Sequence, residues 1–326
     1  MPTKRSSNNC TMNIKSLAIG RLSTKNNVFV APLAGFSDFA FRNICYTLGA
    51  GLCFTEMVSV KGLTYGGQGT KELLKTTDAE YVKAVQLFGD DPDIFVKAVK
   101  LTELDKFDLI DVNMGCPVPK VFNNGEGSAL LLKPDLAEAI VSKLAKAGKT
   151  VSVKMRLGVE RGQNVAVELG KRLEGAGAKL LTLHARAKCD YYSGEPDYAE
   201  CERLKNAVKI PVIFNGGIFT ASDADMAMEK SGADGVMLAR GALRTPWLIN
   251  EILKTPLPDK RELITRHFDM ICDDRGERAA CTYFRKQMAL YLKNVRGAKK
   301  LKEKVFVALT KKEYHDVIDE AFSLNE

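Results

Sequence analysis

Short apolar runs and longer amphipathic stretches alternate along the chain from Val28 onward. The short runs are rich in valine, isoleucine and leucine at consecutive positions, which is typical of parallel strands that are covered on both faces. Eight such runs predict eight strands, at Val28–Pro32, Leu52–Thr55, Ala84–Leu87, Leu109–Asn113, Val151–Met155, Leu180–His184, Pro211–Phe214 and Gly235–Leu238.

Helical periodicity fills most of the intervals between these strands. The predicted helices cover Phe39–Leu48, Pro92–Leu104, Pro134–Ala147, Asn164–Ala176 and Ala221–Ser231. Three Gly-Ala steps, which begin at Gly49, Gly177 and Gly232, end helices directly before a strand. Eight β/α units in about 230 residues match the size of a (β/α)8 TIM barrel.

A doubly wound α/β sheet is the alternative fold for this pattern. Such a sheet places a glycine-rich GxGxxG turn after its first strand, to bind a phosphate. Here the first strand leads into Pro32-Leu33-Ala34-Gly35, which lacks that motif. The sequence therefore favours the barrel.

The strand pattern stops after Pro256-Leu257-Pro258, and only helical periodicity follows. We therefore expect three parts: a disordered polar extension over residues 1–11, a TIM-barrel catalytic domain over residues 12–255 and a helical domain over residues 256–326. Met12 offers an alternative start at the end of the extension.

The composition of the 326-residue chain, with 45% apolar and 27% charged residues, is that of a soluble protein. No apolar run approaches the roughly 20 residues that span a bilayer. The polar segment Met1–Asn13 lacks the apolar centre of a signal peptide, so a cytoplasmic location is expected. The eight cysteines include no CxxC pair, which predicts reduced thiols and no metal site.

Basic residues outnumber acidic ones by 48 to 40, and one segment holds nearly all of the +8 surplus. A run of charge is ordinarily a solvated helix face. Because this surplus is so concentrated, we favour a nucleic-acid-binding surface. We call this segment the basic window; its only acid is Glu303, and its basic residues are Arg285, Lys286, Lys293, Arg296, Lys299, Lys300, Lys302 and Lys304.

Chemistry in a TIM barrel belongs to the loops at the carboxyl ends of the strands, and phosphate sites often follow strands seven and eight. After the seventh predicted strand, Asn215-Gly216-Gly217 lets bare backbone N–H groups approach an anion. After the eighth, Ala239-Arg240-Gly241 adds a guanidinium. Two such loops in this order predict a phosphate site rather than a pair of plain turns.

Three other strand ends carry candidates for chemistry. Lys154 ends an apolar run, where a charged side chain requires either a counter-charge or a functional role. That role is either to form a Schiff base or to stabilise negative charge on a cofactor ring. His184 stands beside Arg186, which favours ligand contact over a core histidine. Cys116 lies in a Met-Gly-Cys-Pro loop. At this position we expect a functional thiol rather than an unreactive cysteine that only fills space in the core.

The segments around these candidates resemble the dihydrouridine synthase family, most closely its bacterial B-type branch. The resemblance follows the family's order across nearly the whole barrel, and the Asn-Met-Gly-Cys-Pro segment is its most specific part. The matching segments are APLAGFSDFAFR (31–42), TEM (55–57), QLFG (86–89), DVNMGCPVPKVFNNGEGSALL (111–131), VSVKMRLG (151–158), HARAKCDYYSGEPDY (184–198), PVIFNGGI (211–218) and DGVMLARGALRTPWL (234–248).

This resemblance implies an enzyme that uses FMN and NADPH to reduce uridine to 5,6-dihydrouridine in tRNA, with Cys116 as the catalytic acid. It implies a helical tRNA-binding domain and places Asn113, Arg186 and Lys188 near the substrate; we add Arg285, Lys286, Lys293, Arg296, Lys299 and Lys300 from the basic window. The implied FMN contacts are Pro32, Leu33, Ala34, Gln86, Lys154, His184, Asn215, Gly216, Gly217, Ala239 and Arg240.

The chain departs from the family's usual sequence at two places that concern the handling of RNA. The family often has His-Gly-Arg-Thr-Arg where this chain has His184-Ala185-Arg186-Ala187-Lys188. It often has Arg-Lys-His where this chain has Arg285-Lys286-Gln287. These changes concern the handling of RNA more than the binding of the flavin.

In the expected reaction, uracil C6 receives a hydride from FMN and C5 receives a proton from Cys116. A cysteine with an ordinary pKa of about 8.5 is mostly protonated at neutral pH and can donate that proton. The alternatives are a dihydroorotate-dehydrogenase-like enzyme acting on a free pyrimidine, a non-catalytic RNA-binding flavoprotein and a Schiff-base aldolase using Lys154. A monomer that binds tRNA, with no membrane and no metal, is expected.

Overall fold

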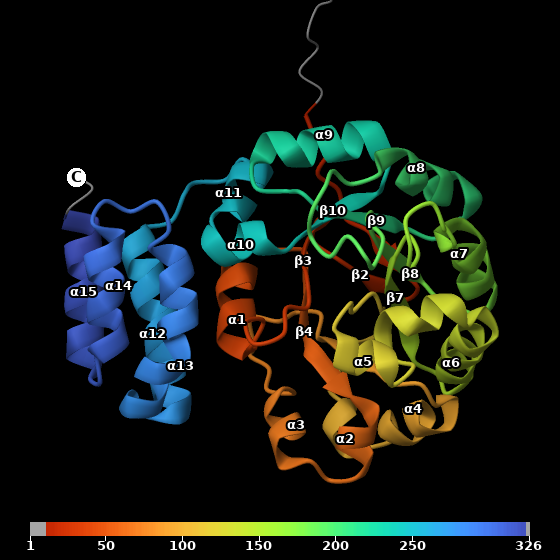
Figure 1. Cartoon of the computed structure of the whole chain (residues 1–326), viewed down its shortest axis with the longest axis horizontal. Helices are drawn as coiled ribbons and strands as arrows, with labels where there is room; N and C mark the ends of the chain where they lie inside the picture. Colours follow the sequence, from red (N-terminus) through yellow and green to blue (C-terminus); the bar gives the residue numbers. More distant parts are fainter. Residues whose placement is uncertain (1–10, 324–326) are drawn as a thin grey trace, which may run out of the picture.

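A closed barrel of eight parallel strands dominates the computed structural model, which describes residues 11–323 (Figure 1). The strands neighbour one another in chain order, and the last pairs with the first. The predicted TIM barrel is confirmed, whereas the predicted extension over residues 1–11 lies outside the described residues except for Thr11. The barrel strands are β3 (Val28–Val30), β4 (Leu52–Ser59), β5 (Ala84–Phe88), β6 (Leu109–Met114), β7 (Thr150–Arg156), β8 (Leu180–His184), β9 (Val212–Asn215) and β10 (Gly235–Leu238).

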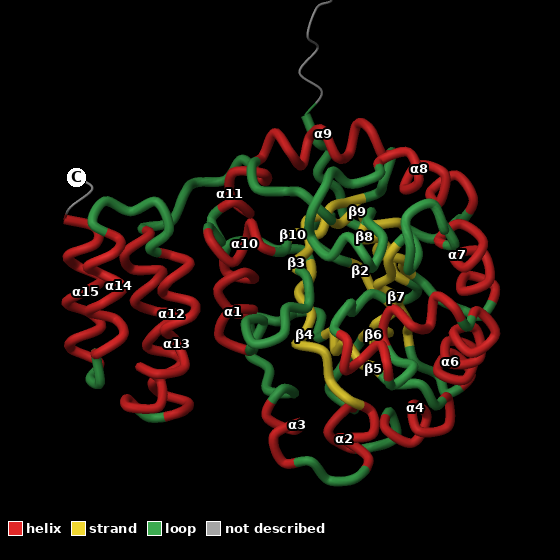
Figure 2. The backbone as a smooth tube through the Cα atoms, in the orientation of Figure 1, coloured by secondary structure: helices red, strands yellow, loops and turns green. Residues whose placement is uncertain are grey.

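Helices surround the barrel and alternate with its strands (Figure 2). Gly49, Gly177 and Gly232 have positive φ at the predicted helix ends, because the left-handed conformation that stops a helix costs glycine little. These helices are α1 (Phe39–Thr47), α2 (Val60–Thr64), α3 (Gln68–Glu72), α4 (Pro92–Ala98), α5 (Pro119–Asn123), α6 (Pro134–Lys146), α7 (Ala166–Gly175), α8 (Tyr198–Ala207), α9 (Ala221–Ser231), α10 (Arg240–Arg244) and α11 (Leu248–Leu253), with 3-10 turns η1 (Thr102–Leu104) and η2 (Gly127–Leu132).

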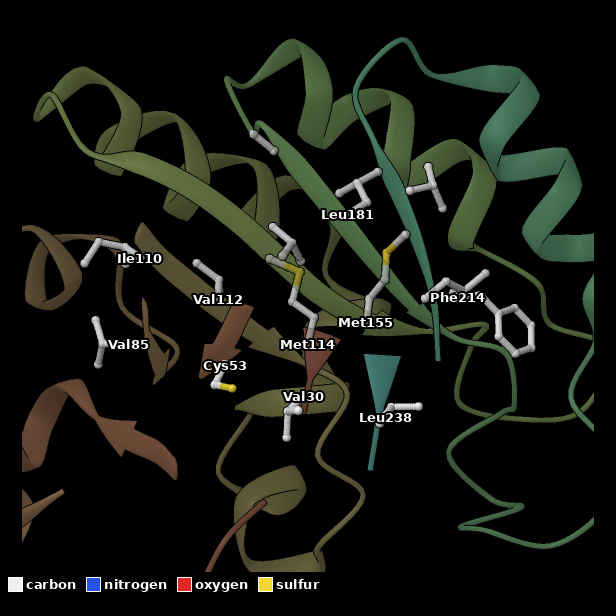
Figure 3. Close-up of a cluster of buried hydrophobic side chains, with 14 of the residues drawn as sticks. Val30, Cys53, Val85, Ile110, Val112, Met114, Met155, Leu181, Phe214 and Leu238 are labelled. Atoms are coloured by element: carbon white, nitrogen blue, oxygen red, sulfur yellow. The ribbon is translucent and has the colours of Figure 1, made fainter. Parts of the chain in front are cut away.

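Alternate residues of each strand point into the barrel or toward the helices. The outward set, which includes Val112, Met155 and Leu181, forms the main core between strands and helices (Figure 3). The inward set forms a second core at the amino ends of the strands, where Phe29 and Leu52 are fully buried. The two cores hold the barrel rigid beneath the loops at its carboxyl ends.

A short hairpin that the sequence pattern did not reveal closes the amino end of the barrel. Its strands are β1 (Ala18–Ile19) and β2 (Leu22–Ser23). Leu17 and Ile19 pack into the inward core, so the barrel is closed at this end. Strands of two residues carry no measurable period, which is why this element escaped prediction.

Two predicted elements depart from their expected bounds by more than two residues. β4 continues to Ser59, with a register shift between Phe54 and Met57 against β5. The predicted helix Pro92–Leu104 divides into α4 and the 3-10 turn η1, because the backbone tightens to i→i+3 hydrogen bonds at Lys100 and Leu101.

The carboxyl-terminal helices form a bundle beside the barrel, next to α1 and α10 (Figure 1). They are α12 (Lys260–Arg275), α13 (Glu277–Tyr291), α14 (Ala298–Val307) and α15 (Lys311–Ser323). A separate core surrounds Phe268, Phe284 and Tyr314, and the rings of Phe268 and Tyr314 stack at 4.2 Å. Within the described chain, no helix is long and apolar enough to cross a membrane.

Direct hydrogen bonds tie this bundle to the barrel. Gln287 donates to the carbonyl of Leu243 at 2.9 Å, and Tyr283 donates to the Asp38 carboxylate at 3.0 Å. Gln287 is buried, so this difference from the family's usual Arg-Lys-His sequence lies at the contact between bundle and barrel rather than on the exposed surface.

Candidate active site

A pocket of about 340 Å³ opens at the carboxyl ends of the barrel strands. It gathers every residue that the resemblance assigned to the cofactor, together with three assigned to catalysis or substrate. These lining residues are Pro32, Leu33, Ala34, Gln86, Lys154, His184, Asn215, Gly216, Gly217, Ala239 and Arg240, with Cys116, Asn113 and Arg186. Segments from almost every strand of the barrel thus converge on one cavity.

The loop after β9 exposes its backbone to this pocket. Gly216 has φ +133° and Gly217 has φ +72°, conformations that residues with side chains rarely adopt. A Cβ at Gly217 would lie 3.1 Å from Pro196 Cγ, and one at Gly216 would lie 3.1 Å from a guanidinium nitrogen of Arg186. The positive φ angles and these close neighbours favour glycine at both positions, and both glycines line the pocket.

Arg240 faces the same side of the pocket from the start of α10. Its guanidinium lies 4.9 Å from the ring centre of Tyr192 and 5.5 Å from that of Phe219. Between these two rings the cation is oriented without a carboxylate partner among the ion pairs of residues 11–323. It is available to an anionic ligand beside the glycine loop.

A chain of hydrogen bonds runs beneath the pocket from β7 to the cysteine loop. Ser152 donates to Asp111 at 2.6 Å, and Gln86 donates to the other Asp111 oxygen at 2.7 Å. Asn113 donates to Gln86 Oε1 at 2.7 Å, and its own oxygen accepts from the backbone N–H of Cys116 at 2.9 Å. The amide of Gln86 is thereby fixed in orientation, and so is the turn that carries the thiol.

Two ionisable side chains accompany this chain, the buried Asp111 and the partly buried Lys154. Burial raises the pKa of Asp111 to about 6, against the hydrogen bonds from Ser152 and Gln86 that lower it. Burial, and secondarily the nearby Arg156, lower the pKa of Lys154 to about 8. At neutral pH the lysine is still mainly a cation, and it presents that charge to the pocket.

The Cys116 loop is held in place by groups on both sides. Arg156 donates to the carbonyl of Gly115 at 2.9 Å, and Ser128 donates to the carbonyl of Cys116 at 2.7 Å. Gly127, at φ +61°, lies so close that an added Cβ would meet Cys116 Cβ at 3.0 Å. Burial raises the pKa of the thiol, so it is protonated at neutral pH.

His184, which ends β8, and Arg186, which follows shortly after it, form a polar pair. Arg186 Nη1 lies 3.3 Å from His184 Nε2. Burial, reinforced by the positive charges of Lys154 and Arg156, lowers the pKa of His184 well below its usual value. The imidazole is therefore neutral, and its Nε2 accepts the hydrogen bond from the guanidinium.

The other residues predicted to contact substrate lie outside this pocket. The Lys188 ammonium lies over the ring of Phe122 at 4.1 Å. Lys286 lies over Phe36, which lines the pocket, at 5.1 Å, and it faces Gly35. Arg285 stacks on Phe306 at 4.9 Å. The remaining basic-window residues named for RNA are exposed on the bundle: Lys293, Arg296, Lys299 and Lys300.

Several lining residues received no role from the sequence. Arg156 and Tyr192 lie within segments that matched the family, but only the folded chain shows that Arg156 holds the cysteine loop and packs 5.7 Å from the Tyr192 ring. Phe36, Met57 and Phe219 also line the pocket. Within residues 11–323 there is no cluster of histidine, cysteine and carboxylate side chains that would hold a metal.

Comparison with known proteins agrees with this geometry. Residues 29–325 match the family described as Dihydrouridine synthase (Dus). The chain is 37% identical over 287 residues to a "Probable tRNA-dihydrouridine synthase" of Rickettsia bellii (strain RML369-C), covering 84% of this chain and 88% of the relative. It is 34% identical over 290 residues to "tRNA-dihydrouridine synthase B" of Pasteurella multocida (strain Pm70), covering 86% and 87%.

Solved structures resemble the fold at lower identity. Morphinone reductase in complex with tetrahydroNAD superposes with a TM-score of 0.55 at 17% identity, over 76% of this chain and 93% of the reductase. Such a likeness supports the barrel alone, whereas the family match extends over nearly all of the described residues. The chain belongs to the dihydrouridine synthase family.

Proposed function

We propose that this chain reduces uridine in tRNA to 5,6-dihydrouridine, with FMN as its cofactor and NADPH as its reductant. The observation that carries this proposal is the convergence of a protonated thiol, a partly buried cation and a bare glycine loop on one pocket. The names of the relatives support the same activity.

The residues of the pocket fit FMN. A phosphate needs bare N–H groups and a cation, which Gly216, Gly217 and Arg240 offer on one side. A flat ring with polar edges needs apolar walls and fixed hydrogen-bonding groups, which Leu33 and Gln86 supply. When bound and reduced, the flavin supplies the hydride that uracil C6 accepts.

Cys116 acts as the acid that donates a proton to uracil C5. Its burial keeps the proton on sulfur at neutral pH, so the thiol is already in the protonated form that can donate it. Asn113 and Arg156 hold the loop on which the thiol stands. A fixed loop keeps the proton within reach of the substrate without a conformational search.

Lys154 stabilises negative charge within the pocket. A cation that is desolvated by its surroundings interacts more strongly with a nearby anion than it would in water. Its pKa of about 8 leaves it charged under neutral conditions. His184 is neutral and therefore adds no second positive charge at this point.

The target uridine leaves its stack to enter this pocket, since a base within a folded RNA cannot otherwise reach Cys116. The exposed basic window on the neighbouring bundle supplies the phosphate contacts that hold the rest of the RNA. We propose that the enzyme works as a monomer in the cytoplasm, where tRNA is found.

Product formation tests the proposal directly. Purified chain, loaded with FMN and given NADPH, is incubated with unmodified tRNA, and the nucleosides are analysed by mass spectrometry for dihydrouridine. Dihydrouridine in the tRNA, with none formed when NADPH is omitted, is the expected result. Reduction of bound flavin by dihydroorotate, with no dihydrouridine in any tRNA, would overturn the proposal in favour of a free pyrimidine substrate.

A further inference from the structure

A second cavity, of about 370 Å³, lies between the barrel and the helical bundle. We call it the interdomain pocket. The barrel contributes Phe219, Arg244 and Trp247 to its lining, and the bundle contributes Lys260, Tyr291 and Lys293. Figure 1 shows α10, which ends at Arg244, beside α13, which ends at Tyr291.

The lining combines aromatic rings with positive charge. The Lys260 ammonium lies 4.9 Å from the ring centre of Trp247, and the Arg244 guanidinium lies 5.4 Å from that of Phe219. No acidic side chain lines the pocket, and neither Arg244, Lys260 nor Lys293 forms an ion pair with a carboxylate among residues 11–323. A ligand that joins a flat ring to an anion suits this surface, and a nucleotide is such a ligand.

The interdomain pocket adjoins both surfaces that the proposed function uses. Phe219 lines both this pocket and the active-site pocket; its ring lies 5.5 Å from Arg240, which lines the active site, and 5.4 Å from Arg244, which lines the interdomain pocket. Lys293 belongs to the basic window. The cavity therefore lies on the path between the target uridine and the basic face of the bundle.

We propose that the interdomain pocket binds a second nucleotide of the RNA substrate, one near the target uridine. This inference rests on the proposed function. Extrusion of the uridine breaks its stacking with its neighbours in the loop. A neighbouring base then stacks on Trp247 and Phe219, while its phosphate contacts Arg244 and Lys293. Stacking on aromatic side chains is the usual way in which proteins hold unpaired bases.

Trp247 provides the test, since it is the only tryptophan in the chain. Fluorescence is recorded on the FMN-loaded enzyme while unmodified tRNA is added at constant salt. Quenching of the tryptophan emission upon tRNA binding is expected. The variant Arg244→Gln/Lys293→Gln, which keeps the rings, should bind tRNA about tenfold or more weakly and, because it loses one phosphate contact, lower the log–log salt slope by about 0.7 to 0.9.

The matched control is Lys100→Gln/Lys146→Gln, which removes the same charge from exposed positions near α4 and on α6. It should keep the affinity of the wild type. If the double variant at the pocket matches this control in affinity and quenching, while wild type still makes dihydrouridine, the inference is wrong and the proposed function stands. If wild type makes no dihydrouridine, the proposed function itself fails.

A free nucleotide is the competing occupant, and the same protein distinguishes it. RNA-free reduction of the flavin by NADPH is measured for wild type and for Arg244→Gln/Lys293→Gln. An unchanged KM for NADPH is expected if the pocket serves RNA. A raised KM for NADPH, with quenching of Trp247 by NADPH alone and no change in tRNA affinity, would assign the pocket to the reductant and overturn the inference.

Discussion

At the scale of single residues, the pocket sets the protonation states that the proposed reaction needs. Cys116 keeps its proton because burial disfavours the thiolate, although Arg156 and Lys154 act in the opposite direction. His184 loses its proton for the same reason, since burial disfavours any added charge. One environment thus yields a thiol acid, a neutral imidazole and a lysine of lowered pKa.

Replacement of Cys116 should separate the two half-reactions. Cys116→Ala should leave flavin reduction by NADPH near the wild-type rate, because hydride delivery to the flavin needs no thiol. Uridine reduction should fall by about 10² to 10⁴-fold, the usual contribution of a positioned acid. Stopped-flow measurement of flavin absorbance reports both steps, and equal rates of re-oxidation by tRNA in variant and wild type would exclude Cys116 as the acid. Cys201→Ala, at a buried site outside the pocket, is the control.

Flavin retention should depend on pH through Lys154. The lysine is charged below its pKa of about 8 and neutral above it, so its contribution to binding the reduced, negatively charged flavin ring is present at lower pH and lost as pH rises through about 8. The reduced flavin that stays bound after anaerobic dialysis is measured on both sides of that value. Lys154→Met should bind flavin less well and lose this inflection; an unchanged inflection would place its origin elsewhere.

At the scale of elements, the loop after β9 has a backbone conformation that would be strained in residues other than glycine, and it lies at the ligand pocket. Gly217→Ala should cost about 1–2 kcal/mol in stability, because alanine at φ +72° is strained. It should also weaken FMN binding, since the added Cβ crowds Pro196 at 3.1 Å. Gly162→Ala is the matched control, with φ +80° and no atom within 4 Å. Thermal unfolding and flavin titration separate the two effects, and equal flavin affinities would remove the loop from the site.

Arg240 belongs to the same phosphate site at the start of α10. A charge-assisted hydrogen bond contributes about 1.5–3 kcal/mol, so Arg240→Ala should weaken FMN retention tenfold or more. Its effect on tRNA affinity should be smaller. Flavin content after dialysis measures the first quantity and a filter-binding assay the second; full retention of flavin by the variant would contradict the assignment.

At the scale of the whole molecule, the bundle carries its charge on an exposed face beside the active site. Charge reversal of Lys299, Lys300 and Lys302 to glutamate should weaken tRNA binding and lower its log–log salt slope by about 0.7–0.9 for each lost phosphate contact. RNA-free oxidation of NADPH should stay normal. The same reversal at the exposed Lys100, Lys146 and Lys209 is the control. If both triple variants show the wild-type slope, the basic window is an ordinary solvated face.

The sequence by itself determined the order of the barrel and the positions of most candidate side chains along it. The eight apolar runs are a local property, because the composition of each strand alone indicates that the strand is buried. The candidate residues could be placed at strand ends for the same reason: in a barrel, the carboxyl ends of all strands meet at one edge. Cys116, Lys154 and Gly217 therefore line one pocket, as their positions in the chain predicted.

Only the tertiary structure decided the features that depend on contacts between distant segments. The irregular register of β4, the packing of the β1–β2 hairpin on the amino end of the barrel and the support of the cysteine loop by Arg156 all depend on partners far away in the chain. The interdomain pocket is the clearest case. In the sequence Trp247 has no assigned role and Lys293 is one member of the basic window, and the two share a cavity because Gln287 and Tyr283 fix the bundle against the barrel. Periodicity reports which face of an element is buried, but not which other element buries it.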